Sequence, residues 1–134
     1  MDASATKAVQ RFGTISLQVS DLERSVHFYR DSLGLGFDNY VSGSALGAKV
    51  GEVLLLLHRD SDSMPKGKER GIGIELHFDV PDADAYFAEL KERGVIVDQE
   101  PHDQPWGRAF SLMDPDGYAI EFVGPSRKQF GILG

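Results

Sequence analysis

Two glutamates in strand-like segments are the residues of this sequence best suited to chemistry. Glu121 follows the turn D-P-D-G at residues 114–117 and stands among apolar neighbours, while Glu75 lies two residues before His77 on the same strand face. An unpaired carboxylate is costly to bury, and two close together share a proton or hold a cation. These acids therefore indicate a metal ligand, a general base or a partner for a positively charged group.

Several side chains could keep Glu121 ionised. Arg108 lies on the segment that we expect to pair with the strand of Glu121, where a charge-assisted hydrogen bond would form. His77 or His58 could supply an imidazole instead. Hydroxyl and amide donors share one face of the segment 14–19: Thr14, Ser16 and Gln18. A polar cavity that contains a Glu–Arg pair would need no metal.

An aromatic loop adds further candidates. The segment P-H-D-Q-P-W-G at 101–107 holds Trp106, the single tryptophan of the chain, and Arg108 and Phe110 follow it. An aromatic side chain at the mouth of a cavity suits a planar or apolar ligand. Trp106 could equally close the core or a contact between subunits, and the sequence favours neither role.

Composition limits the classes of protein to consider. The 134 residues suffice for one domain, with 41% hydrophobic and 26% charged residues, as in soluble globular proteins. The net charge of −7 disfavours nucleic acid and anionic membranes as partners. The absence of cysteine excludes disulfides and a cysteine nucleophile. Without a membrane-length apolar run or a signal-peptide core, we expect a cytoplasmic location.

The hydrophobic pattern of the first half predicts a strand, a helix and further strands. Residues 14–19 alternate as in a strand, and the S-x-x-E spacing of Ser20 and Glu23 predicts a capping box at the start of a helix. Apolar residues then recur at helical spacing until Gly34. Two or three strands broken by glycines follow within 37–60.

The second half repeats this plan. Residues 19–31 align with residues 80–92 at a constant offset of 61, and a helix starts at Pro81-Asp82. Its strands are predicted at 74–80, 95–97, 108–113 and 118–123. We therefore expect an α+β fold made of two βαβββ modules. The predicted organisation is a leader at 1–10, one domain at 11–125 (module one 11–60, linker 61–71, module two 72–125) and a tail at 126–134.

Two motifs resemble the vicinal oxygen chelate superfamily, which includes glyoxalase I, the bleomycin- and fosfomycin-resistance proteins and the extradiol dioxygenases. They are VSDLERSVHFYRDSLGL at 19–35 and DPDGYAIEF at 114–122. The resemblance implies half-barrel modules whose concave faces enclose a cavity, and a homodimer. Enzymatic members hold a divalent metal in that cavity.

The resemblance also implies where metal ligands would lie. These positions fall on Thr14, Leu55, Glu75 and Glu121, so the histidines of the family are missing. Transition metals favour imidazole, and His58 would join the two glutamates only if a β-bulge turned it inward. A cavity without a metal is therefore favoured, and a Zn, Ni, Mn or Fe site built on the two glutamates and His58 is the alternative.

Two functional hypotheses follow from the resemblance. In the first, the chain binds a small organic molecule without a metal, as bleomycin-resistance proteins do. The expected ligand contacts are Thr14, Ser16, Gln18, Leu55, His58, His77, Trp106, Arg108 and Phe110. In the second, a metal-dependent lyase, isomerase or dioxygenase uses Glu121 as a ligand and Glu75 as a ligand or base. Metal-free catalysis with Glu75 or His77 as base is a third hypothesis.

Overall fold

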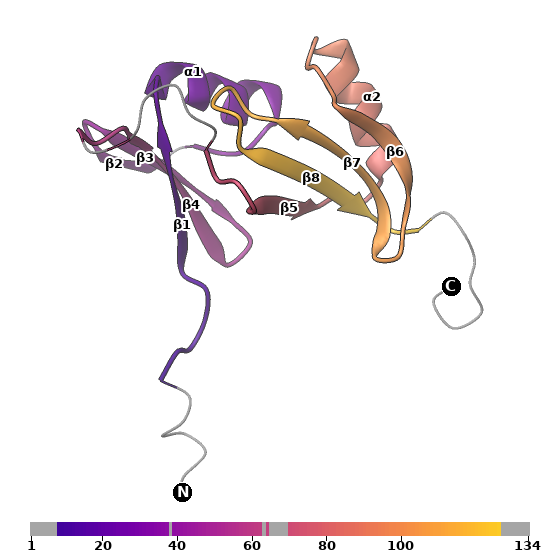
Figure 1. Cartoon of the computed structure of the whole chain (residues 1–134), viewed down its shortest axis with the longest axis horizontal. Helices are drawn as coiled ribbons and strands as arrows, with labels where there is room; N and C mark the ends of the chain where they lie inside the picture. Colours follow the sequence, from indigo (N-terminus) through magenta and orange to yellow (C-terminus); the bar gives the residue numbers. More distant parts are fainter. Residues whose placement is uncertain (1–7, 38, 63, 65–69, 127–134) are drawn as a thin grey trace, which may run out of the picture.

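The chain folds as two four-stranded sheets, each with a helical segment on one face (Figure 1). The computed structural model describes residues 8–37, 39–62, 64 and 70–126. The predicted α+β class, with two βαβββ modules, is confirmed. Most of the expected leader, the centre of the linker and nearly all of the tail lie outside the described residues.

The first sheet comes from the first half of the chain. Its strands, in spatial order, are β1 (Thr14–Val19), β4 (Val53–Arg59), β3 (Ala45–Val50) and β2 (Asn39–Ser42). β1 and β4 are parallel, whereas β4 pairs with β3 and β3 with β2 in antiparallel fashion. A parallel pair needs a long connection, and here that connection contains the helical segment and the outer strands.

The second sheet repeats this arrangement. Its strands, in spatial order, are β5 (Glu75–Asp79), β8 (Ala119–Gly124), β7 (Gly107–Met113) and β6 (Gln99–Gln104). β5 and β8 are the parallel pair, and the remaining pairs are antiparallel. The internal repeat predicted from the offset of 61 is thus present in the strand order of both halves.

One predicted strand is wrong. Residues 95–97 form no strand, and the outer strand β6 begins at Gln99 and continues to Gln104, into the segment 101–107 that we expected to be a loop. Val95 and Val97 are apolar because they pack against the core as part of a connection. β6 escapes hydrophobic pattern analysis because an outer strand exposes most of its side chains and can be polar throughout.

Both helical segments start at an aspartate. The first comprises α1 (Leu22–Val26) and the π-helical η2 (His27–Ser32), and the second is α2 (Ala83–Glu92). Asp21 and Asp82, which are 61 residues apart, accept hydrogen bonds of 3.1 Å from Arg24 N and Ala85 N. The predicted capping box is therefore wrong, because Asp21 is the cap. The hydroxyl of Ser20 instead donates to Asp116 at 2.6 Å.

The core lies between each sheet and its helical segment. Aromatic rings fill the second half, where Phe110 and Phe122 are fully buried with ring centroids 5.1 Å apart. Tyr86 of α2 contacts Phe122 edge-on at 5.0 Å between centroids. Among the described residues, no helix has the length and apolar character needed to cross a membrane.

The turn between β7 and β8 fastens the two halves to each other. Asp114, at its start, is buried and accepts hydrogen bonds from Asp116 N at 2.8 Å and Tyr118 N at 2.9 Å. The hydroxyl of Tyr29 in η2 donates to the same carboxylate at 2.7 Å. Gly117, at the exit of this turn, has φ +90°, a conformation that glycine adopts without steric cost. The turn therefore sets where β8 begins relative to the first half.

We predict that Tyr29→Phe lowers the free energy of unfolding by about 1–3 kcal/mol, because it leaves a buried carboxylate oxygen without its hydroxyl donor. Urea denaturation followed by circular dichroism measures the loss. Tyr86→Phe is the matched control, since its hydroxyl donates to the carbonyl of Leu33 at 2.6 Å from a half-buried position. A larger loss in the control than in Tyr29→Phe would contradict the prediction.

The burial of Asp114 also predicts a pH dependence. Burial raises the pKa of its carboxyl above the ordinary value of 3.8, while the bond from Tyr29 opposes this shift. The folded state then holds a proton more tightly than the unfolded state, so the contribution of Asp114 to stability falls as the pH rises above 3.8. The free energies of unfolding of wild type and Asp114→Asn are measured from below that pH to neutrality. As the pH rises, the free energy of unfolding of wild type should fall relative to that of the variant. Parallel curves would contradict this.

Candidate functional site

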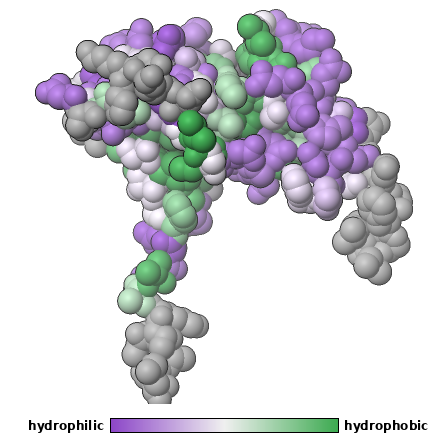
Figure 2. All heavy atoms as spheres, viewed as in Figure 1, coloured by the Kyte–Doolittle hydropathy of each residue, from purple (hydrophilic) through white to green (hydrophobic). Residues whose placement is uncertain are grey.

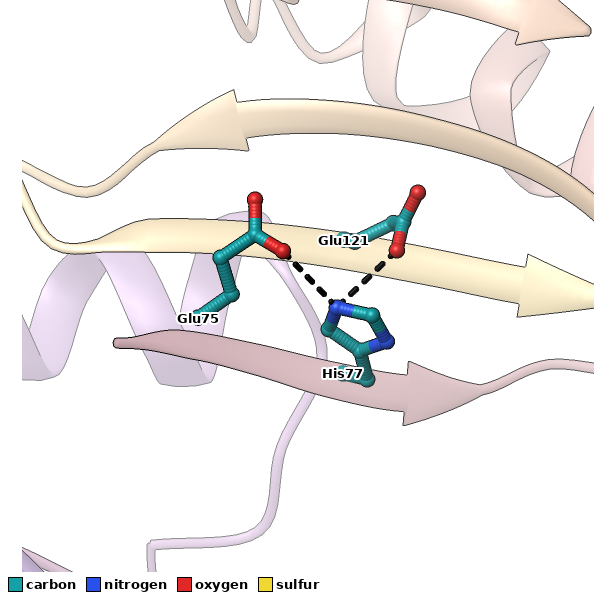
Figure 3. Close-up of side chains that lie close together, drawn as sticks. All are labelled: Glu75, His77 and Glu121. Carbon is teal, nitrogen blue, oxygen red and sulfur yellow. Dashed lines mark hydrogen bonds and ion pairs between the residues drawn. The ribbon is translucent and has the colours of Figure 1, made fainter. Parts of the chain in front are cut away.

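Glu75, His77 and Glu121 lie together on β5 and β8 (Figure 3). They are on the opposite face of the sheet from Phe122, which contacts Tyr86 of α2. β5 and β8 are parallel neighbours, and His77 lies directly opposite Glu121 in their register. Leu76 and Ile120 alternate with these residues and are buried in the core. The alternation that buries the apolar side chains therefore brings two acids and an imidazole together, and we call them the Glu–His–Glu cluster.

One nitrogen of His77 faces both carboxylates. Its Nε2 is 3.1 Å from Glu75 Oε1 and 3.0 Å from Glu121 Oε2, and Figure 3 shows both contacts converging on this atom. The contact to Glu75 is a hydrogen bond, whereas Glu121 Oε2 is buried without a hydrogen-bond partner among the described residues. A single N–H cannot point at two acceptors, so one carboxylate oxygen remains unsatisfied.

The three side chains lie at different depths. The side chain of Glu121 is only 8% exposed, that of His77 is 41% exposed and that of Glu75 is 61% exposed. Glu121 is therefore the most deeply buried member of the cluster, His77 lies between it and solvent, and Glu75 is the most exposed. An acid without a full complement of donors at this depth costs stability.

A pocket of about 920 Å³ opens beside the cluster, and we call it the β5 pocket. It is lined by Arg70, Gly71, Ile72, Gly73, Ile74, Glu75, His77, Met113, Asp116, Gly117 and Ala119. Three of its apolar side chains are well exposed: Ile72, Ile74 and Met113. Figure 2 shows hydrophobic surface near the middle of the molecule, whereas the surface over α2 and β6 is mostly hydrophilic. The pocket thus joins an apolar wall to an acidic corner.

The other end of the β5 pocket is closed by a satisfied ion-pair network. The guanidinium of Arg70 donates to both oxygens of Asp60, at 2.6 and 2.7 Å, and to the carbonyl of Gln18 at 2.8 Å. These bonds to Asp60 raise the pKa of Arg70. Arg70 also lies 3.9 Å from Asp116. It is therefore committed to structure and does not neutralise the Glu–His–Glu cluster.

Most candidates from the first sheet lie away from this pocket. Thr14 and Ser16 are exposed on β1 and do not line the β5 pocket. The side-chain oxygen of Gln18 accepts a hydrogen bond from Ser61 N at 2.9 Å, which anchors the loop after β4. His58, half-buried at the end of β4, contacts the adjacent carbonyl of Arg59. None of these residues belongs to the Glu–His–Glu cluster.

The residue of module one that matches Glu121 is Leu56, and the expected match with Leu55 is wrong. His77 pairs with Glu121, and Ser16, which lies 61 residues before His77, pairs with Leu56. The alignment on turn glycines fails because the turn before β4 is shorter than the turn before β8. Leu55 is instead buried on the core face of β4, where it lines a small cavity of about 200 Å³ with Glu75 and His77.

Arg108 does not pair with Glu121, contrary to our expectation. Its guanidinium lies 3.1 Å from Asp84 of α2 and 3.7 Å from Asp103, so it belongs to the helix-covered face of β7. Phe110 shares that face and is fully buried in the core, while Trp106 is exposed at the turn between β6 and β7. These three residues are therefore not brought to the β5 pocket.

Sequence reasoning missed the apolar wall of the pocket. We placed Ile72 at the start of module two, Ile74 at the start of a strand and Met113 at the end of one, without a role in ligand binding. The alternation of β7 could have identified Met113, because Phe110 and Leu112 face the core and Met113 therefore faces the other side. No sequence pattern marks Ile72, since its exposure depends on how the linker enters β5.

The Glu–His–Glu cluster fits a divalent cation. Its three candidate ligand atoms lie within 4.8 Å of one another, and Glu121 has a carboxylate oxygen, Oε2, without a hydrogen-bond partner among the described residues. Carboxylate and imidazole ligands suit Zn, Ni, Mn and Fe. His77, and not His58 as expected, supplies the imidazole. A metal there would polarise oxygen atoms of a bound substrate.

Solved structures with the same fold include proteins of differing roles. TnmS3, an antibiotic-binding protein from Streptomyces sp. CB03234, is 35% identical over 89% of this chain and 98% of its own, with a TM-score of 0.70. A lactoylglutathione lyase from Agrobacterium tumefaciens has a TM-score of 0.68 over 88% of this chain and 96% of its own, and its 22% identity shows the fold alone.

Sequence comparison identifies the family. Protein YraH of Bacillus subtilis (strain 168) is 32% identical over 127 residues, which cover 80% of this chain and 92% of that protein. The family model for the glyoxalase/bleomycin resistance protein/dioxygenase superfamily matches residues 11–122. The chain therefore belongs to the glyoxalase/bleomycin resistance protein/dioxygenase superfamily.

Proposed function

We propose that this protein binds a small organic molecule in the β5 pocket without a metal. The observation that carries the proposal is the buried carboxylate of Glu121, whose Oε2 has no hydrogen-bond partner among the described residues. It lies under His77, one of the residues that line a pocket large enough for a drug-sized ligand. An acceptor kept unsatisfied at the edge of such a pocket supports a binding role.

The relation to TnmS3 supports the same proposal. That protein is described as antibiotic-binding, and its identity of 35% extends over nearly its whole length. Ligand recognition without chemistry requires only shape, apolar contact and a few polar groups. The exposed Ile72, Ile74 and Met113 supply the apolar contact, and Glu75 and His77, which line the pocket beside Glu121, supply the polar one.

A metal-dependent lyase, isomerase or dioxygenase is the second candidate, and the Glu–His–Glu cluster favours it. Glu121, His77 and Glu75 would hold the ion, which would polarise neighbouring oxygens of a substrate. Module one contributes Thr14 and Leu56 at the corresponding positions, and a leucine cannot be a ligand. Three ligands from one module would leave open positions for a substrate.

Assembly as a homodimer, which the family resemblance implies, stays a prediction. The apolar wall of the β5 pocket is open in a single chain, with Ile72, Ile74 and Met113 exposed to 77%, 64% and 56%. Sedimentation at several protein concentrations measures the assembly.

We expect wild type purified without an affinity tag to retain little metal after incubation with Zn, Ni, Mn or Fe(II). Elemental analysis measures this, with Glu121→Ala as the test variant and Glu92→Ala, at the exposed end of α2, as the control. A small-molecule screen by NMR should then find ligands that shift resonances of the β5 pocket. Near-stoichiometric metal in wild type that is lost only in Glu121→Ala would overturn the metal-free proposal and favour the enzyme.

If the buried carboxylate of Glu121 is retained for function, it should lower the free energy of unfolding of the ligand-free protein. We predict that Glu121→Leu raises the free energy of unfolding by about 1–3 kcal/mol in metal-free buffer, because it removes an unsatisfied buried acceptor. Glu75→Leu should be nearly neutral, since its side chain is mostly exposed. Chemical denaturation measures both. A loss of stability in Glu121→Leu would show that its carboxylate is well satisfied.

A further inference from the structure

We propose that the ligand of the β5 pocket is an organic cation, an amine or guanidine on an apolar body. Its charged group takes the place of the His77 imidazole between Glu121 and Glu75. This inference rests on the proposed function and specifies the class of its ligand.

The cluster has more negative than positive charge, so a bound cation would stabilise it. Two carboxylates share one imidazole N–H, so even a charged imidazole would leave one negative charge without a partner. Arg70, the cation at the far end of the pocket, is held by two hydrogen bonds to Asp60. A ligand ammonium or guanidinium carries several N–H donors and could satisfy both glutamates at once.

The spacing of the cluster suits such a group. Its ligand atoms lie within 4.8 Å of one another. Two oxygens that each accept a hydrogen bond of about 2.8 Å from different N–H groups of one tetrahedral ammonium lie ~4.6 Å apart, which is inside this limit.

His77 is placed to act as a removable cover. Its side chain is partly exposed and lines the β5 pocket, whereas Glu121 beneath it does not line that pocket. The Nε2 of His77 reaches Glu121 at ion-pair distance without satisfying Oε2 by a hydrogen bond. If the imidazole rotated toward solvent, Glu121 would become accessible from the pocket. This rotation would break one hydrogen bond, the exposed one between His77 and Glu75.

The rest of the pocket predicts that the remainder of the ligand is neutral and apolar. Ile72, Ile74 and Met113 form the wall next to the cluster. Asp116, at the far end, already accepts hydrogen bonds from Ser20 and is close to Arg70. A ligand with its charge at one end and an apolar body therefore matches the pocket along its length.

The test compares three probes of one shape: 4-phenylbutylammonium, 4-phenylbutan-1-ol and 4-phenylbutanoate. Each is titrated into the full chain by NMR at one pH with a chelator present. We expect the amine to bind at least about tenfold more tightly than the alcohol, and the carboxylate to bind most weakly. Resonances of the β5 pocket should shift. Equal affinity for amine and alcohol, or no binding of the amine at this pocket, would overturn the inference.

Variants locate the contact. Glu121→Gln should remove the preference for the amine, while Glu92→Gln, which makes the same change of charge on α2, should keep it. His77→Ala should tighten amine binding severalfold, because the cover is gone. Weaker amine binding in His77→Ala would contradict the role of the imidazole as a cover.

The outcomes separate this inference from the function on which it rests. If amine and alcohol bind the β5 pocket equally and Ile74→Asp weakens both, the pocket binds organic molecules and only the cation preference fails. If wild type holds stoichiometric metal through Glu121, the proposed function itself fails.

Discussion

A buried carboxylate in a turn, Asp114, holds the rest of the structure in place. It accepts two backbone hydrogen bonds within its own turn and one from Tyr29 of the other half. The turn would be a surface loop without these bonds, and the start of β8 would be free to shift against η2. Because β8 carries Glu121, the geometry of the candidate site depends on the hydrogen bonds in the turn that precedes this strand.

The two halves share one topology but differ in chemistry. Both pair their first and last strands in parallel, which places the residues at Ser16 and Leu56 in one half where His77 and Glu121 lie in the other. The first sheet thereby has neither an acid nor an imidazole at the positions that match His77 and Glu121, and His58 lies two residues beyond Leu56 on the same face of β4. The candidate site is built by the second sheet and the segment that leads into it, and the first half supplies its support through Asp60 and Gln18.

Burial and the hydrogen bonding of carboxylates are in conflict at Glu121. Asp114 is as deeply buried as Glu121, yet it has three donors, whereas Glu121 Oε2 has no hydrogen-bond donor among the described residues. Evolved proteins tolerate such a cost where a site needs the group. Both acids belong to the β7–β8 hairpin. The hydrogen bonds of Asp114 identify it as a structural carboxylate, whereas the missing donor of Glu121 identifies it as a candidate functional one.

The sequence by itself determined the repeat, the helices, most strands and the pairing of Glu75 with His77 on one face, because these follow from local periodicity and from an offset that persists along the chain. It missed β6, because a polar outer strand has no apolar pattern, and it misassigned Leu55, because turns of different length break the alignment. Only the tertiary structure decided that Arg108 serves Asp84 and not Glu121, and that Ile72, Ile74 and Met113 line the pocket. The physical reason is that partners across strands depend on register and on the path of connections, which are set by the packing of the whole chain and not by neighbours in sequence.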